Sequence, residues 1–193
     1  MGTLGKGHFA KVKEVVHIEA QESYAVKILD KSHAENDVED MVREFQMLRA
    51  LRHPNIIRLY AAYESPHKLY LVTELASGGE LMKRLATTEK TYSEDAVRDH
   101  IRAILTAVQY MHEKGCVHRD IKPENVLLGA SGEAVLVDFG LALRMPPAPP
   151  GADAAVCLTA AFAASRNVFT AANPSSLSVH TSIMCGPPAW RAC

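Results

Sequence analysis

Closely spaced glycines near the start of the chain could bind phosphate. In Gly5-Lys-Gly7-His-Phe-Ala10, two positions lack a Cβ atom, so backbone N–H groups can approach phosphate oxygens there. A P-loop would need Gly-Lys followed by Ser or Thr, whereas His8 follows Gly7. A dinucleotide fingerprint would need a helix next, whereas residues 11–18 look extended. A glycine-rich hairpin between two strands fits better, and an ordinary glycine turn is the alternative.

A lysine and a glutamate form the second candidate. Lys27 lies inside the apolar run 24–29, where an ammonium group is costly unless it finds partners. Glu44 follows 17 residues later, at the edge of a helical apolar stripe, and is the natural partner. The alternatives are a lysine that reaches solvent from an edge strand and a solvated helix carboxylate.

Two polar motifs follow in the second half of the chain. Five positions of His118-Arg-Asp120-Ile-Lys122-Pro-Glu-Asn125 match the pattern H-R-D-x-K-x-x-N, a chance event on the order of one in 10⁴. Asp138-Phe-Gly140 comes 18 residues after Asp120. A packed core histidine is the alternative for His118 alone, but the whole constellation indicates a functional site.

The elements that must position these groups are strands first and helices later. We predict strands over residues 10–18, 24–29, 56–63 and 69–75, and a hairpin of residues 126–128 and 134–137. Asp37 could cap a helix with apolar positions at helical spacing: Val38, Met41, Val42, Phe45 and Leu48. A longer helix is predicted between an N-cap at Ser93 and a C-cap at Gly115. This order indicates an α+β fold rather than a regular βαβ alternation.

In their order along the chain, these motifs resemble those of the eukaryotic protein kinase family. The resemblance covers about residues 2–144 and is closest to the calcium/calmodulin-dependent branch of serine/threonine kinases. The resemblance to this branch rests on four segments: Leu4–Ala10, His53–Ile57, Gly78–Leu81 and Asp120–Asn125. The resemblance implies a protein kinase domain over residues 1–144 with an incomplete two-lobe fold. The small β-rich lobe would take about residues 1–74, and the first part of the helical lobe about residues 75–144.

The resemblance also implies a role for each matching residue. Lys27 would hold the α- and β-phosphates of ATP and pair with Glu44, Asp120 would accept the proton of the substrate hydroxyl, and Lys122 would lie near the γ-phosphate. Asn125 and Asp138 would ligate Mg²⁺. Glu80 and Glu124 would bind an arginine on the N-terminal side of the acceptor, as in basophilic kinases. The alternative for Glu80 is that it only helps to start its helix and binds the ribose of ATP. ATP would contact the following residues: Leu4, Gly5, Lys6, Gly7, His8, Phe9, Ala10, Val12, Ala25, Lys27, Thr73, Glu74, Ala76 and Leu127. Leu48, Leu59, His118 and Phe139 resemble the stacked column that joins the two lobes.

The composition changes sharply after Arg144. Of the 43 charged residues 40 lie before this boundary, and 7 of the 10 prolines lie after it. The run Met145-Pro-Pro-Ala-Pro-Pro-Gly151 cannot continue a helix or a central strand, so residues 145–184 are predicted to be disordered or an inserted part of the activation segment. Residues 185–193 resemble the end of a kinase activation segment, with Pro187 and Cys193 departing from its usual pattern. A chance match of composition is the alternative.

Charge and cysteine content limit the other function classes. The 21 basic and 22 acidic residues give a net charge of −1, which argues against nucleic-acid partners and a polybasic membrane protein. The four cysteines show no metal-ligand spacing and indicate free thiols in a reducing compartment. We expect a cytoplasmic protein, with the nucleus as the alternative location.

The predicted function is an ATP-dependent serine/threonine kinase that acts on protein substrates, with an unidentified regulator. The alternative is a catalytically silent kinase fragment that binds nucleotide or a partner without phosphoryl transfer. This alternative is kept because the family's later large-lobe helices have no counterpart in the sequence.

Overall fold

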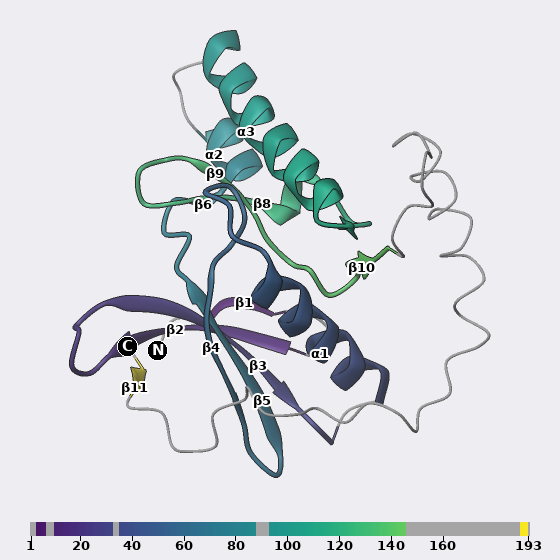
Figure 1. Cartoon of the computed structure of the whole chain (residues 1–193). Coiled ribbons are helices and arrows are strands. Elements are labelled where there is room, and N and C mark those ends of the chain that lie inside the picture. The colour runs from purple at the N-terminus through teal and green to yellow at the C-terminus, as the bar shows by residue number, and fades with distance from the viewer. Residues whose placement is uncertain (1–2, 7–9, 33–34, 88–92, 146–189, 193) are drawn as a thin grey trace.

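The computed structural model describes residues 3–6, 10–32, 35–87, 93–145 and 190–192. An antiparallel sheet forms its first half (Figure 1), in the strand order β1-β2-β3-β5-β4. The strands are β1 (Thr3–Lys6), β2 (Ala10–His17), β3 (Ser23–Asp30), β4 (Leu59–Glu64) and β5 (Lys68–Glu74), and a short strand β11 (Trp190–Ala192) also pairs with β2. Helix α1 (Glu35–Ala50) contacts β3 and β4.

The second half is helical, with short strands facing the sheet. Its helices are α2 (Leu81–Thr87) and α3 (Glu94–Glu113), and a single 3₁₀ turn, η1, covers Pro123–Asn125. Strands β6 (Gly79–Glu80), β8 (Val126–Leu128) and β9 (Ala134–Leu136) form one small sheet, and β7 (Cys116–Val117) pairs with β10 (Leu143–Arg144). In the described part of the chain, no helix is long and apolar enough to cross a membrane.

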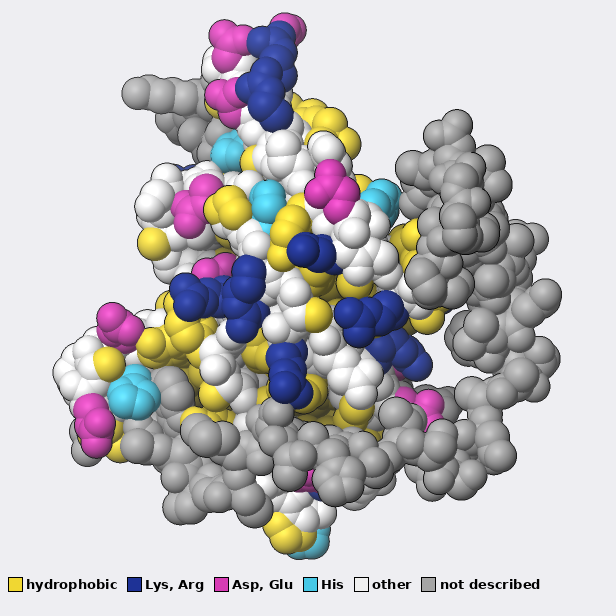
Figure 2. Space-filling model, in the orientation of Figure 1, with side chains coloured by type: hydrophobic (Ala, Val, Ile, Leu, Met, Phe, Trp, Pro, Cys, Tyr) yellow, Lys and Arg dark blue, Asp and Glu magenta, His cyan; other side chains and the backbone are white. Residues whose placement is uncertain are grey.

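The expected N-cap of α3 is confirmed, and the C-cap is Lys114, one residue before the expected Gly115. The Ser93 hydroxyl accepts the backbone N–H of Ala96 at 3.2 Å, and Gly115 follows the helix with a φ of +67°, a conformation that glycine adopts without strain. On its exposed face, acidic and basic side chains alternate at the N-terminal end of the helix (Figure 2), where Asp95 pairs with Arg98 and Asp99 with Arg102.

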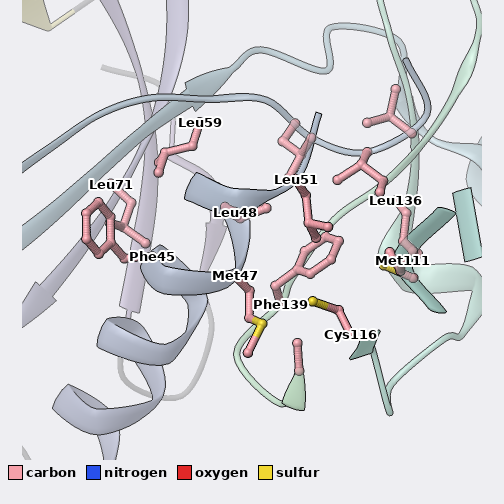
Figure 3. Close-up of a cluster of buried hydrophobic side chains, with 14 of the residues drawn as sticks. Phe45, Met47, Leu48, Leu51, Leu59, Leu71, Met111, Cys116, Leu136 and Phe139 are labelled. Carbon is pink, nitrogen blue, oxygen red and sulfur yellow. The ribbon is translucent and has the colours of Figure 1, made fainter. Parts of the chain in front are cut away.

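One hydrophobic core runs through both halves of the molecule. Figure 3 shows Phe139 between Met47, Leu48 and Leu51 on the side of α1 and Met111, Cys116 and Leu136 on the other side. Phe139 and Met111 are completely buried. A second, smaller cluster of Val15, Val26 and Val72 covers the opposite face of the sheet. The first core therefore holds the sheet and the helical half in a fixed relation.

Two predicted element bounds need correction. Helix α1 begins at Glu35, so Asp37 lies inside its first turn rather than at its cap. Residues 56–58 are not part of a strand of the large sheet, because the backbone of Ile57 bonds to Leu136 and Ile56 forms a bridge with the same residue. Their apolar side chains are buried as the pattern indicates, but the backbone joins the two halves.

The α+β fold class and the incomplete two-lobe architecture are confirmed: a β-rich small lobe leads into the start of a helical lobe. The predicted character of residues 145–184 falls almost entirely outside the described residues. Of residues 185–193 only β11 is described, so their likeness to an activation segment stays a prediction.

Candidate active site

Strand register gathers four of the predicted ATP-contacting residues on one face of the large sheet. Val12 on β2 lies opposite Lys27 on β3, and Ala25 lies opposite Thr73 on β5. Ala25 and Lys27 are two residues apart on one strand, so their side chains share a face, and so do their cross-strand partners. This is the face that α1 covers, because Glu44 of α1 reaches Lys27 there.

Lys27 lies between two carboxylates that come from distant parts of the chain. Its Nζ atom is 2.5 Å from Oε2 of Glu44 and 3.2 Å from Oδ1 of Asp138. The Glu44 side chain is only 7% exposed, whereas that of Asp138 is 49% exposed. The buried carboxylate thus anchors the lysine, and the open one faces solvent beside it.

Burial and charge oppose each other at this ion cluster. Burial alone would lower the pKa of Lys27, but the carboxylates of Glu44 and Asp138 outweigh it and raise that pKa above its ordinary value. Burial would raise the pKa of Asp138, but the ammonium group of Lys27 outweighs it and lowers that pKa. Lys27 is therefore a permanent cation at neutral pH, and Asp138 a permanent anion.

A second polar cluster surrounds Asp120. Its Oδ2 atom accepts hydrogen bonds from Nζ of Lys122 at 2.7 Å and from Nδ2 of Asn125 at 2.9 Å. Nδ2 of Asn125 also donates to the carbonyl of Asp120 at 2.8 Å, and Asn125 is buried at the end of η1. The Asn125 amide fixes the backbone of the loop at Asp120, while the exposed ammonium group of Lys122 orients the partly exposed Asp120 carboxylate.

The buried side chain of His118 connects the Lys27 cluster and the Asp120 cluster. Its Nε2 lies 3.1 Å from the carbonyl of Val137, and its Nδ1 accepts the N–H of Asp120 at 3.3 Å. These contacts fix the neutral tautomer with the proton on Nε2. Burial lowers the pKa of His118, which keeps the ring neutral, and the ring packs edge-on against Phe139 with centroids 4.6 Å apart. One histidine therefore orients the loops that carry Asp120 and Asp138.

Two non-glycine residues of these loops have left-handed backbone conformations. Arg119 has a φ of +66° and Asp138 a φ of +62°. Such conformations cost free energy and persist where the surroundings hold them, which is common at functional sites.

The segment between β5 and β6 joins the large sheet to the small one beside the site. Gly78 donates its N–H to the carbonyl of Leu128 at 2.9 Å, and Glu80 lies opposite Leu127 in the register of β6 and β8. Glu74 at the end of β5 is tied by Oε1 to the N–H of Arg58 at 3.2 Å. Of the predicted ATP contacts, Glu74, Ala76 and Leu127 thus lie on or beside this connection.

The glycine-rich segment is only partly described. Strands β1 and β2 form an antiparallel pair on either side of it, as the hairpin interpretation predicts. Gly7, His8 and Phe9 lie outside the described residues, and of Leu4, Gly5, Lys6 and Ala10 only the backbone is described.

The donor set fits a magnesium nucleotide. In the described part of the chain, no group of three or more His, Cys, Asp or Glu side chains could hold a metal ion. Mg²⁺ in nucleotide sites is bound by one or two protein oxygens together with phosphates and water. Asp138 offers an exposed carboxylate, and Asn125 has an amide oxygen that the described hydrogen bonds leave unused. These two residues would hold the ion.

The two carboxylates predicted to bind substrate differ in their surroundings. Glu124 is exposed in η1, next to Asn125. Glu80 is half-buried, directly before α2, and its Oε1 lies 2.5 Å from Nζ of Lys83. An approaching guanidinium group would have to replace Lys83 at Glu80.

Sequence reasoning assigned no role to three polar residues that hold the site together. Nε of Arg119 donates to the carbonyl of Leu141 at 2.6 Å, and NH1 of Arg43 on α1 lies 3.5 Å from the carbonyl of Gly140. Nδ2 of Asn55 donates to the carbonyl of Ala134 at 2.8 Å. Arg119 and Asn55 both lie within motifs quoted from the sequence, but their partners are carbonyls, which carry no sequence signal.

The protein kinase domain family matches residues 1–180 of the chain. A "probable serine/threonine-protein kinase" of Dictyostelium discoideum is 41% identical over 141 residues, which are 72% of this chain and 31% of that protein. CBL-interacting protein kinase 21 of Oryza sativa subsp. japonica is 44% identical over 140 residues, 72% of this chain and 26% of its own. Serine/threonine-protein kinase SIK1 of Mus musculus is 42% identical over 149 residues, 77% of this chain and 19% of its own.

The chain belongs to the protein kinase family. Its relatives are serine/threonine kinases and include members of the calcium/calmodulin-dependent kinase-like branch, which confirms the resemblance seen in the sequence. The chain spans between about a fifth and a third of the length of these three relatives.

Proposed function

We propose that this chain binds ATP with Mg²⁺ and transfers the γ-phosphoryl group to serine or threonine hydroxyls of protein substrates. The observation that carries the proposal is the position of Lys27 between Glu44 and Asp138, on a sheet face that continues through Val12, Ala25 and Thr73. Family membership supports it, because protein kinases generally use ATP and Mg²⁺.

Each polar residue then has a defined task. Lys27 binds phosphate oxygens and is kept in place by Glu44, which is itself buried. The carboxylate of Asp120 accepts the proton of the substrate hydroxyl, and Lys122 beside it binds phosphate oxygen. Asn125 and Asp138 would hold the ion, and Mg²⁺ bound there would supply positive charge that stabilises the phosphates. Apolar Val12, Ala25 and Leu127 provide surfaces for the adenine ring.

The test is Lys27→Met. Loss of the cation removes the main contact to the phosphates, so phosphoryl transfer to a serine peptide should fall below detection. Lys68→Met is the matched control, because Lys68 is an exposed lysine at the far end of β5. Undiminished transfer in the Lys27 variant would contradict the proposal. Nucleotide binding by the unaltered chain without any transfer would instead support the silent fragment.

We further propose that the enzyme prefers substrates with arginine on the N-terminal side of the acceptor. A carboxylate accepts two parallel hydrogen bonds from a guanidinium group, which selects arginine over lysine. Glu80 and Glu124 are the carboxylates that would make these contacts. Their positions beside Leu127 and Asn125 support the proposal.

Glu80→Ala should lower kcat/KM for an arginine-containing peptide, by an amount that corresponds to a loss of about 1–3 kcal/mol of transition-state stabilisation. The kcat/KM for a peptide without that arginine should stay nearly unchanged. Lys83→Ala is informative in the opposite direction, because it frees Glu80 from its intramolecular partner. This second variant should strengthen the preference for arginine. Equal losses for both peptides in Glu80→Ala would move Glu80 to nucleotide binding.

A further inference from the structure

Two segments from opposite parts of the sequence lie along the same edge of β2. Strand β1 pairs with Lys11–Lys13, from Thr3 opposite Lys13 to Lys6 opposite Lys11. Strand β11 pairs with Val15–His17, from Trp190 opposite His17 to Ala192 opposite Val15. Both are antiparallel to β2, so both run in the same direction, and β11 leads towards the start of β1 (Figure 1). Together they act as one interrupted edge strand.

The backbone pattern of β2 tells which groups face β11. The N–H of His17 donates to the carbonyl of Glu22, and its own carbonyl accepts from Gln21, so His17 directs its backbone groups towards the turn before β3. Neighbouring residues of a strand direct these groups to opposite sides. Val16 therefore presents its N–H and carbonyl to β11, where Arg191 lies directly opposite.

An exposed row of such groups is a template for an added strand. We propose that the edge of β2 at Val15–His17 is a docking site for an extended segment, and that its occupant is this chain's own residues 190–192. Docking within one molecule is favoured over docking of a second copy, because the covalent connection keeps residues 190–192 near their own β2, whereas a second copy has to arrive from solution.

The docked strand also affects the proposed nucleotide site, and this part rests on the proposed function. Strand β2 carries Val12 on its site face and leads directly from the glycine-rich segment. Because β1 pairs with only the first part of β2, β11 is the described segment that pairs with the rest of this edge. Docking thus restrains the strand that positions the glycine-rich segment, and its release should weaken nucleotide binding.

The experiment compares two proline variants by hydrogen exchange in the absence of nucleotide. Arg191→Pro removes the N–H that faces Val16. Ala192→Pro removes an N–H that faces away from β2, and an edge strand tolerates proline at such a position. The amide of Val16 should exchange about tenfold faster in Arg191→Pro than in the unaltered chain, and at an unchanged rate in Ala192→Pro. Val16 amides that exchange at the same rate in all three proteins would overturn the docking site. If protection of the Val16 amide rises with protein concentration, the docked strand comes from a second copy, and the proposal of docking within one molecule is wrong.

A nucleotide titration then separates the two proposals. The Kd for an ATP analogue should rise by about fivefold in Arg191→Pro and stay unchanged in Ala192→Pro. Equal affinities, together with a faster Val16 amide, would overturn the coupling and leave the docking site intact. If the unaltered chain binds no nucleotide, the proposed function fails, and the exchange result still decides the docking site.

Discussion

At the scale of single residues, the site depends on charges that hold one another in place. Without Glu44, Lys27 would keep only the more exposed Asp138 as a partner, and without Lys27, Glu44 would be a buried carboxylate that has lost its cation. Burial of one partner of an ion pair without the other is strongly destabilising. The two residues therefore need to be considered as a unit, to which Asp138 adds a third, more exposed charge.

Glu44→Gln tests this unit without a change in size. The amide keeps the shape of the side chain but removes its charge, so Lys27 should shift towards Asp138 and away from the phosphates. We expect kcat/KM for ATP to fall at least about tenfold, as for other losses of an electrostatic contact in an active site. Glu39→Gln on the exposed side of the same helix is the control and should change nothing. Steady-state kinetics of both variants decide the matter, and equal values would show that Lys27 needs no partner.

The buried histidine gives the folded state a pH dependence. Burial lowers the pKa of His118 below its ordinary value of 6.5, so the unfolded chain takes up a proton at a higher pH than the folded one. The contribution of neutral, buried His118 to the free energy of unfolding is complete above pH 6.5. It is lost as the pH falls from there towards the lower pKa of the folded state.

His118→Gln keeps a donor for the carbonyl of Val137 and removes the titration. Its free energy of unfolding should fall less steeply between pH 6.5 and 5 than that of the unaltered chain. Some slope should remain, because burial also lowers the pKa values of His53 and His112. Urea unfolding over this range measures the slopes, with the exposed His67→Gln as the control. A slope in His118→Gln as steep as in the unaltered chain would speak against this role of His118.

At the scale of elements, the periodicity of apolar residues predicted the main strands, α1 and α3, and the capping residue Ser93 predicted the start of α3. Strands β6, β7 and β10 have only two residues each, too few for an alternation to be recognised. The polar residues of the site could be found because they lie in short motifs. The contacts of Arg43, Arg119 and Asn55 could not, since they depend on which carbonyls the tertiary fold brings near.

The connection between β5 and β6 leaves no room for a side chain at Gly78. A Cβ atom added at Gly78 would lie 2.6 Å from Cβ of Leu128 and 2.9 Å from its carbonyl oxygen. Gly78→Ala should therefore push the small sheet away from the connection and destabilise the fold by about 1–3 kcal/mol. Gly79→Ala is a useful comparison, because it meets no atom within 4 Å and suffers only from a φ of +75°. Thermal unfolding of the two variants should show the larger loss at Gly78, and the reverse order would mean that strain in the backbone outweighs the close contact.

At the scale of the whole molecule, the two lobes share one core rather than meeting at a surface. Phe139 follows Asp138 directly and is buried between residues of α1 and residues of the helical half (Figure 3). The position of a metal-binding candidate is thus set by packing between lobes. The sequence indicates both lobes and the motifs that join them, but not that Ile57 and Leu136 would connect them through their backbones.

A shared core predicts that the lobes unfold together. Met111 on α3 is completely buried in this core, and truncation of a buried methionine typically costs about 2–5 kcal/mol. Met111→Ala should therefore accelerate amide exchange not only in α3 but also in β5 of the large sheet, by a similar factor. Leu105→Ala is the control on the same helix, because Leu105 is 62% exposed and its truncation should change stability by no more than about 0.5 kcal/mol. Hydrogen exchange followed by mass spectrometry reports both elements in one experiment. If β5 kept its protection in Met111→Ala while α3 lost it, the small lobe would be stable by itself, and the common core would not couple the two lobes.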